Sequence, residues 1–404
     1  MLKGRFDSPA VLRDNHIPME LAFTDHAPLR SWEALKTTTT FEIARCSRYL
    51  KATLLVPHVV LSTSTKNGGQ QRALRVLVNH QSCEGKDDGE RQRLIKELGL
   101  ERYHDRVCDE MEIDAATAAV MGTAANMNYA SIVSLTDRDL AVTAVVTAGV
   151  QGNACCAGDP AGWREEDGTW LPINPLAGTI NTMVLINREL SEGALARAAI
   201  TMTEAKSAAL TRLAVGSLYS HDVATGTGTD QFCIGAACTG EAPLTSTSPH
   251  VLLGELIGRT VRDATLEALR WQNGMEPSYT RGVFHALGRF GLKEASVYEG
   301  LAEHLEARAL EMLRQNAKSV FYEPMVSAAA YAFAAVIDRV RYQTLPPSIA
   351  KEALRHQGAC LAVALAAKPD KWSEFRNALP EPQPEDPKAL VLAAIALGWK
   401  SKWI

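Results

Sequence analysis

Short apolar stretches rich in β-branched residues, separated by turn residues, dominate the chain between about residues 50 and 236. Strands are predicted for 53–62, 74–79, 131–136, 140–147 and 179–187. Asn67-Gly68-Gly69 predicts a turn, because these residues tolerate positive φ. Residues 149–179 are predicted to form an ordered loop, and the sequence of residues 214–236 is again typical of strands.

Helical periodicity marks the remaining segments. We predict helices at 114–127 with Asp114 as N-cap, at 193–213, and at 249–272, where Pro249 follows the capping candidate Ser248. Beyond residue 285, alanine-rich helical patterns follow one another at 293–316, 321–342, 346–367 and 387–404. The pattern therefore predicts an α+β fold: a mixed β-sheet domain with packed helices, then an all-α C-terminal bundle. The expected parts are an N-terminal extension (1–50), an α+β domain (51–285) and a helical domain (286–404).

Composition narrows the function classes. Apolar residues make up 46% and charged residues 22% of 404, enough for a large core. The net charge of -4 and the lack of a basic stripe argue against nucleic acid as the main partner. No apolar run is long enough for a membrane span and no signal-peptide core is present, so we expect a cytoplasmic protein. Eight scattered cysteines without C-x2-C spacing predict neither a disulfide framework nor a metal site, and no cofactor is identifiable.

Polar residues that could carry chemistry gather between residues 145 and 230. A strand that runs into small residues such as Gly149 lets backbone amides approach a ligand closely. Asn153 could donate to an oxyanion, and Asp159 could act as a base or orient one. Taken alone, this segment is explained better by turn geometry. Asn181, at the start of an apolar strand, could bond to neighbouring backbone or face a substrate amide.

The predicted helix 193–213 carries two further candidates. Glu204 shares a stripe with Thr201, and Lys206 lies about 200° around the helix, against an apolar face that includes Met202. A desolvated lysine has a lowered pKa and could serve as base or nucleophile. The alternative, with equal weight, is a lysine whose ammonium reaches water.

Threonine and glycine alternate directly before an aspartate: Thr225, Gly226, Thr227, Gly228, Thr229 and Asp230. In an extended chain this alternation places all the threonine hydroxyls on one face, where they could bind a polar ligand. A glycine-weakened strand at a tight packing site is the alternative. The run matches neither a Walker A loop nor a dinucleotide fingerprint.

The segment that opens the helix 249–272 also contains titratable groups. His250 would fall in the first helical turn, where the helix dipole lowers its pKa and favours the neutral imidazole of a general base. Glu255 has Arg259 four residues on, so a surface ion pair is its alternative role.

Six segments in this order resemble the adenosylcobinamide amidohydrolases of archaeal and bacterial corrinoid salvage, over roughly residues 50–272. They are VVLSTSTKNGG with a later Val78-Asn79, VVTAGV…N…AGDPA, GTINTMVLIN, GALARAAITMTEAKSAAL, ATGTGTDQ and HxxLGELIG. The resemblance implies hydrolysis of the amide between aminopropanol and a propionate arm of the corrin ring. Adenosylcobinamide would become adenosylcobyric acid and 1-amino-2-propanol, in cobalamin salvage and remodelling. The corrinoid is then substrate rather than cofactor.

The same resemblance implies binding or catalytic roles for the motif residues: Asn79, Asn153, Asp159, Asn181, Glu204, Lys206, Thr227, Thr229, Asp230, His250 and Glu255. We expect direct attack by water on the amide. Glu204 or Asp230 would be the base, and Lys206 or His250 would protonate the leaving amine. Asn153 and glycine-rich backbone would bind the oxyanion.

Several alternatives stay open. A covalent mechanism through Thr227 or Thr229 is the second choice. A corrinoid-binding protein without catalysis, or an amidohydrolase for another bulky amide, are the alternative functions. The chain departs from the family pattern at Cys155-Cys156 and at the charged insertion 163–167. Residues 286–404 lie outside the resemblance, where we expect a packing, oligomerisation or lid role; a homo-oligomer stays open.

Overall fold

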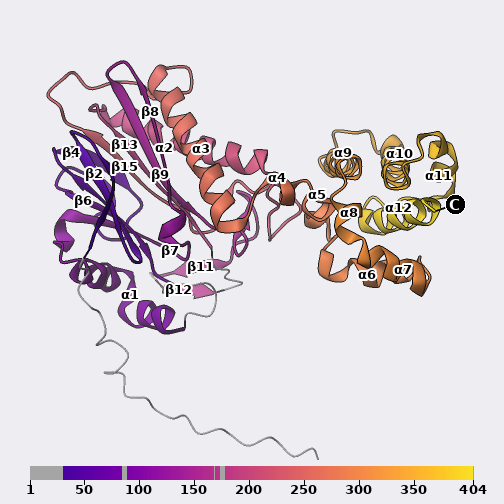
Figure 1. Ribbon diagram of the computed structural model, residues 1–404. Helices are drawn as coiled ribbons and strands as arrows, with labels where there is room; N and C mark the ends of the chain where they lie inside the picture. The colour runs from indigo at the N-terminus through magenta and orange to yellow at the C-terminus, as the bar shows by residue number, and fades with distance from the viewer. Residues whose placement is uncertain (1–30, 84–88, 168, 173–177, 404) are drawn as a thin grey trace, which may run out of the picture.

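The computed structural model describes residues 31–83, 89–167, 169–172 and 178–403, which form two units joined end to end (Figure 1). The first unit contains two β-sheets. One has the order β1 (Glu33–Thr37), β2 (Phe41–Cys46), β3 (Tyr49–Leu54), β6 (Val76–Gln81) and β7 (Ala118–Thr123). The other has the order β5 (Gly69–Gln71), β4 (His58–Ser62), β15 (Gln231–Ala237), β13 (Ile180–Ile186), β9 (Leu140–Ala148) and β8 (Ser131–Asp137).

The two sheets pack face to face, and helices cover both outer faces, which gives four layers. The helix α1 (Gly89–Glu110) packs on the five-stranded sheet, and α2 (Glu192–Arg212) and α3 (Leu252–Asn273) pack on the six-stranded sheet. Alternation along β13 shows how a single strand serves two cores. Met183 points into the core between the sheets, whereas Val184 points toward α2 and α3. All seven residues of β13 are buried, as expected for a strand covered on both faces.

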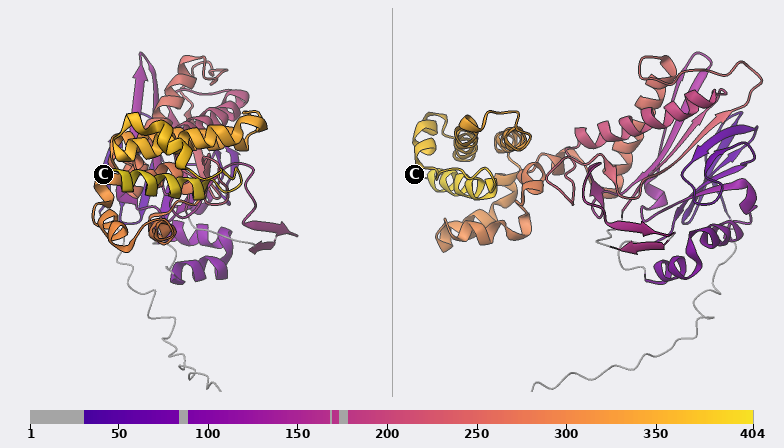
Figure 2. Two further views of the ribbon diagram at one scale, coloured as in Figure 1. Left: turned by 90° about the vertical axis from the view of Figure 1, so that its right-hand side faces the viewer. Right: turned by 180° about the vertical axis from the view of Figure 1, so that it is seen from behind.

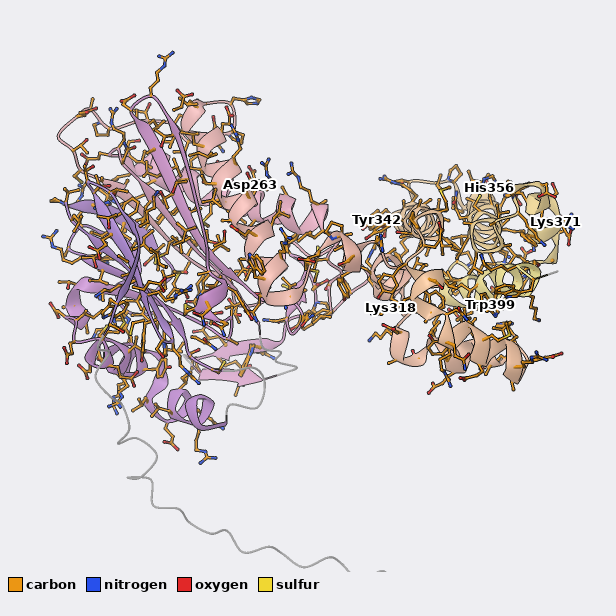
Figure 3. All side chains as sticks on the ribbon, in the orientation of Figure 1. Asp263, Lys318, Tyr342, His356, Lys371 and Trp399 are labelled. Atoms are coloured by element: carbon orange, nitrogen blue, oxygen red, sulfur yellow. The ribbon has the colours of Figure 1, made fainter. Side chains whose placement is uncertain are left out.

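The second unit is helical and lies to one side of the sandwich, with two short helices next to the junction (Figures 1 and 2). It contains α4 (Pro277–Thr280), α5 (Val283–Leu287), α6 (Glu294–Ala302), α7 (Ala307–Gln315), α8 (Ala317–Phe321), α9 (Pro324–Arg341), α10 (Pro347–Ala366), α11 (Trp372–Ala378) and α12 (Pro387–Ser401). Its core is separate from those of the sandwich and begins at Val283. Trp399 is fully buried there, and its indole N–H donates to the Ala309 carbonyl at 2.8 Å (Figure 3). The helical unit therefore has the anatomy of a domain.

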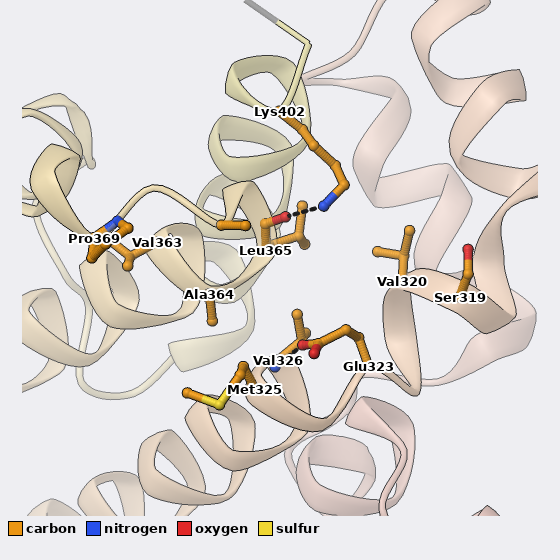
Figure 4. A pocket seen from close by; sticks show the side chains of 11 residues that line it. Ser319, Val320, Glu323, Met325, Val326, Val363, Ala364, Leu365, Pro369 and Lys402 are labelled. Carbon is orange, nitrogen blue, oxygen red and sulfur yellow. Dashed lines mark hydrogen bonds between the residues drawn. The ribbon is translucent and has the colours of Figure 1, made fainter.

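A pocket of about 360 Å³ lies within this helical unit (Figure 4). Its two charged side chains already serve the fold. Lys402 Nζ donates to the Leu365 carbonyl at 3.0 Å, and the Glu323 carboxylate accepts the Val326 amide at the start of α9. The rest of the lining is mostly apolar, so the pocket lacks the converging free polar groups that would orient a ligand.

The predicted α+β class is confirmed, but the secondary structure predicted for two segments was wrong. Residues 53–62 form two strands in different sheets, β3 and β4, because Pro57 interrupts the run and cannot donate a ladder hydrogen bond. Residues 114–127 are not an α-helix. Asp114 caps only one 3₁₀ turn by accepting the Ala116 amide at 2.9 Å, and the chain continues as β7. Parallel pairing of β7 with β6 outweighs the helix propensity of the alanines.

Several boundaries also differ from the prediction. The strands β1 and β2 lie within residues 1–50, the expected extension, and belong to one sheet, in which β1 pairs with β2 and β2 with β3. The helix α3 starts at Leu252 rather than Pro249, because the extended backbone of Val251 supplies the N-cap. The single helix expected at 293–316 is divided into α6 and α7. Helix α1 was not anticipated at all.

The long loop expected at 149–179 contains three short strands. The pair β11 (Trp163–Glu166) and β12 (Thr169–Pro172) forms a hairpin that projects from the body (Figure 2), and β10 (Ala154–Cys155) pairs with β14 (Gly226–Thr227). Parts of this loop, 168 and 173–177, lie outside the described residues. Among the helices that the structure describes, none is long and apolar enough to cross a membrane.

Candidate functional site

Two loops meet at one end of the sandwich, where β9 ends and both β13 and β15 begin. The antiparallel pairing of β9 with β13, and the parallel pairing of β13 with β15, bring these three strand ends to the same edge. The small β10–β14 ladder ties the loop after β9 to the loop before β15. Most of the sequence-predicted candidates lie on these loops.

Lys206 and Asp230 form the centre of this region. Lys206, on α2, donates to Asp230 Oδ2, and the two side chains are 13% and 18% exposed. The same oxygen accepts the Thr227 amide at 3.1 Å, while Oδ1 accepts the Thr227 hydroxyl at 2.6 Å and the Ile180 amide at 2.9 Å. A carboxylate has about four lone-pair positions. All of them are used, so Asp230 has no position left to accept a proton from water.

The close approach of this pair requires a glycine at position 226. An ideal Cβ on Gly226 would lie against Asp230 Oδ2 and 2.7 Å from Lys206 Nζ. We expect Gly226→Ala to separate the pair and lower the kcat of any reaction that needs their contact about 100-fold, because small displacements of catalytic groups are costly. Steady-state kinetics measure this, with Gly193→Ala as the control, since its Cβ would meet no atom within 4 Å. A Gly226→Ala variant with wild-type kcat would contradict this packing argument.

Asn153 is held in one orientation by three neighbours. The Tyr219 hydroxyl donates to Oδ1 at 2.7 Å, which turns Nδ2 toward the Gly178 carbonyl at 2.9 Å and Thr229 Oγ1 at 3.5 Å. The second Nδ2 hydrogen thus points at the exposed Thr229 through a long, weak contact. An N–H group in this position can donate to a developing oxyanion.

Asp159 serves the loop rather than proton transfer. Its carboxylate accepts the Ser217 hydroxyl at 2.5 Å and the Cys156 amide at 2.7 Å. Burial raises the pKa of Asp159, but the hydrogen bonds from Ser217, Ser220 and the Cys156 amide together outweigh it, and the net pKa is lowered. A carboxylate with a lowered pKa is a weak base, so a positioning role fits better.

Asn79 and Asn181 lie in the core between the sheets, not on the surface. Asn181 Nδ2 donates to Asn79 Oδ1 at 2.8 Å, and Asn79 Nδ2 donates to Thr147 Oγ1 at 2.8 Å. The two asparagines are 1% and 0% exposed. Thr179 connects this buried cluster to the loop above by donating to the Thr229 carbonyl at 2.6 Å. These asparagines therefore support the site from below.

The remaining small residues shape the two loops. The Gly149 amide donates to the Thr179 carbonyl at 3.0 Å, and the Thr225 hydroxyl accepts the Ala157 amide at 2.9 Å. Gly228 packs on Asn153, whose side-chain amide would lie 3.3 Å from a Cβ there. Each contact joins one loop to the other or to the strand end below.

Three predicted candidates lie away from this cluster. Glu204 is exposed on α2, and His250 is exposed before α3 begins, so it does not occupy the expected first helical turn. Glu255 pairs with Arg259 at 2.9 Å, the surface alternative. The opposite end of α3 contacts the site, because Asn273 there accepts the Val150 amide. Glu255 lies 18 residues before Asn273 on the helix, a distance of about 27 Å along its axis.

The glycine of the motif around Glu255 has a packing function instead. A Cβ on Gly254 would collide with the Ser248 carbonyl, so the turn before α3 closes only over a glycine. Sequence reasoning also missed two residues of the site, Ser217 and Tyr219. They belong to a polar run directly before the Thr-Gly segment. The cluster of hydroxyl side chains between apolar residues could have identified this run as part of the site.

Within the described residues, no three His, Cys, Asp or Glu side chains converge as a metal-binding group. The family model described as adenosylcobinamide amidohydrolase matches residues 34–277. The chain belongs to the adenosylcobinamide amidohydrolase family. The matched span contains the Lys206–Asp230 pair and both loops, and it ends before the core of the helical unit begins. An uncharacterized protein of Methanocaldococcus jannaschii is 31% identical over 177 residues, 41% of this chain and 68% of that protein.

Proposed function

We propose that this family member hydrolyses the aminopropanol amide of adenosylcobinamide, giving adenosylcobyric acid and 1-amino-2-propanol in corrinoid salvage. Family membership supports the amidohydrolase class. The observation that carries the proposal is the largely buried group of Thr227, Asp230 and Lys206, which combines a hydroxyl, a hydrogen-bonded acceptor and a cation. A nucleophile hydrogen-bonded to a base that a third group orients is the arrangement of covalent catalysis.

The Asp230 carboxylate already accepts four hydrogen bonds, which favours the threonine mechanism over direct attack by water. Of the four donors to Asp230, two are backbone amides and one is Lys206. The remaining donor, the Thr227 hydroxyl, is the only hydroxyl among the four, whereas the Lys206 ammonium is engaged in its ion pair with Asp230. Glu204, the other expected base, is exposed on the helix surface. We therefore infer that Thr227 attacks the amide.

The proposed reaction has two halves. Thr227 Oγ1 bonds to the amide carbon, its proton passes to Asp230, and Asn153 donates to the oxyanion. The C–N bond then breaks, the amine nitrogen takes a proton from Lys206, and Asp230 returns its proton to Lys206. In the second half water attacks the Thr227 ester, gives one proton back to Thr227 through Asp230, and releases the carboxylic acid.

The test is to incubate the purified protein with adenosylcobinamide and identify products by chromatography and mass. We expect adenosylcobyric acid and 1-amino-2-propanol in equal amounts, both with and without a chelator. A shift in corrin absorbance without any product would instead indicate a corrinoid-binding protein. Neither product nor binding would contradict the corrinoid assignment and favour another bulky amide.

A further inference from the structure

A cleft of about 670 Å³ lies between the sandwich and the helical unit. The sandwich contributes the loop after β9 and residues 215–221, and the helical unit contributes α4, α5 and the turn that follows them. Small-molecule sites typically have volumes of about 300–1,000 Å³ and often lie between domains. The helical wall lies almost entirely beyond the segment that the family model matches.

The cleft borders the candidate site directly. Tyr219 lines it and holds Asn153 through its hydroxyl, and Ser217 lines it and donates to Asp159. Burial and the nearby Cys155 and Asp159 raise the pKa of Tyr219, so its hydroxyl keeps its proton and stays a donor. A bulky ligand whose reacting amide lies at Thr227 would thus extend past these side chains into the cleft.

The Arg341–Asp222 ion pair and the hydrogen bond from Arg289 to the His221 carbonyl join the two walls. Arg289 donates to both oxygens of Asp338, at 2.7 and 2.5 Å, and also to the His221 carbonyl at 2.5 Å. Asp222 of the sandwich accepts Arg341 at 3.2 Å and the Tyr342 hydroxyl at 3.0 Å; Tyr342 is labelled in Figure 3. Charges balance within this network, two arginines against two aspartates, so it stabilises the junction and leaves no excess charge for a ligand.

The groups left facing the cleft are hydrogen-bond donors and aromatic rings. The side chains of Gln151 and Lys293 have no hydrogen-bond or ion-pair partner within the part of the chain that the structure describes. Tyr219, Tyr279 and Phe284 supply aromatic surface, and no described lining residue is acidic. Donors around apolar faces suit a flat ligand with many amide carbonyls, which is the chemistry of a corrin ring.

We propose that this cleft binds the amide-bearing corrin ring of the substrate, and that the helical unit forms one wall of the substrate site. The inference rests on the proposed function, because it takes its ligand from there. It gives residues beyond 277 a role in substrate recognition.

Gly288 offers a way to fill the cleft without straining the fold. It lines the cleft, its φ of -59° is ordinary for any residue, and a Cβ there would meet no atom within 4 Å. We expect Gly288→Leu to raise both the Kd and the KM for adenosylcobinamide at least tenfold, with kcat within about threefold of wild type. Gly193→Leu is the matched control, since it is equally unobstructed and about 20 Å along α2 from Lys206.

Binding by absorbance titration and hydrolysis by product analysis are measured on the same full-length preparations. If Gly288→Leu hydrolyses the substrate with unchanged Kd and KM, the proposal that the cleft binds the corrin ring is overturned, but the proposed function is not. Wild-type binding that Gly288→Leu abolishes, without hydrolysis by either protein, would support the cleft and overturn the function. If Gly288→Leu misfolds by circular dichroism, Lys293→Met replaces it: a threefold or larger rise in Kd supports the cleft, and an unchanged Kd overturns it.

Discussion

Thr227→Ala is expected to lower kcat for adenosylcobinamide hydrolysis by about 10⁴-fold, with little change in KM. Among the described residues, the substitution removes the only hydroxyl that donates to Asp230, and it leaves the Lys206 contact in place. Losses of this order are typical when a catalytic nucleophile is removed, because the residual rate comes from binding and oxyanion stabilisation alone. Steady-state kinetics, with product identified by mass, measure the effect.

Two further variants separate a nucleophile from a structural hydroxyl. Thr227→Ser keeps the attacking oxygen and should retain at least a hundredth of wild-type kcat. Thr229→Ala removes the exposed neighbour, whose hydroxyl donates to the Gly178 carbonyl at 2.8 Å, and should cost about tenfold or less. A Thr227→Ala protein that turns over within tenfold of wild type would show that water attacks directly.

Asp230→Asn should have the second largest effect, a loss of about 10³-fold in kcat together with a loss of stability. Each carboxylate oxygen of Asp230 accepts two hydrogen bonds, whereas an asparagine amide has only one acceptor oxygen. The substitution also leaves the Lys206 ammonium, 13% exposed, without its counter-charge. Removing one partner of a largely buried pair costs about 3 kcal/mol. Kinetics and urea unfolding measure the two effects separately.

A double variant separates catalysis from folding. Lys206→Met combined with Asp230→Asn removes the unpaired charge, and replacing both partners of such a pair is often close to neutral for stability. We expect the double variant to unfold near the wild-type urea midpoint and to remain inactive. If activity returned with stability, the pair would be structural and the proposed roles of Asp230 and Lys206 would fail.

Local sequence patterns predicted correctly those elements whose hydrophobic periodicity matches the burial seen in the structure. The strand β13 and the helix α2 lie within one residue of their predicted ends, because a continuous apolar run and an amphipathic stripe each fit one structure. The segment after Asp114 was misread, since its alanines fit a helix locally and only pairing with β6 makes it a strand. The four-layer arrangement depends on such long-range pairing.

The candidate site was predictable where the chemistry is local to one segment. Lys206 on the inner face of α2 and the Thr-Gly run before Asp230 could both be identified from spacing, but their direct contact could not, because 24 residues separate them. His250 and Glu255 are candidates that the sequence suggested but that the structure places away from the site. They belong to a motif whose order along the chain suggested the site, yet His250 lies just before α3 and Glu255 in its first turn, at the end of the helix away from the site.

The most direct test of the account is whether hydrolysis passes through an ester on Thr227. The wild-type protein is incubated with adenosylcobinamide and hydroxylamine, and both the corrinoid product and the released 1-amino-2-propanol are quantified by mass. We predict a corrinoid hydroxamate whose amount increases with hydroxylamine concentration and which is absent with Thr227→Ala. Adenosylcobyric acid as the sole corrinoid product, together with a Thr227→Ala variant that keeps the wild-type rate, would contradict it.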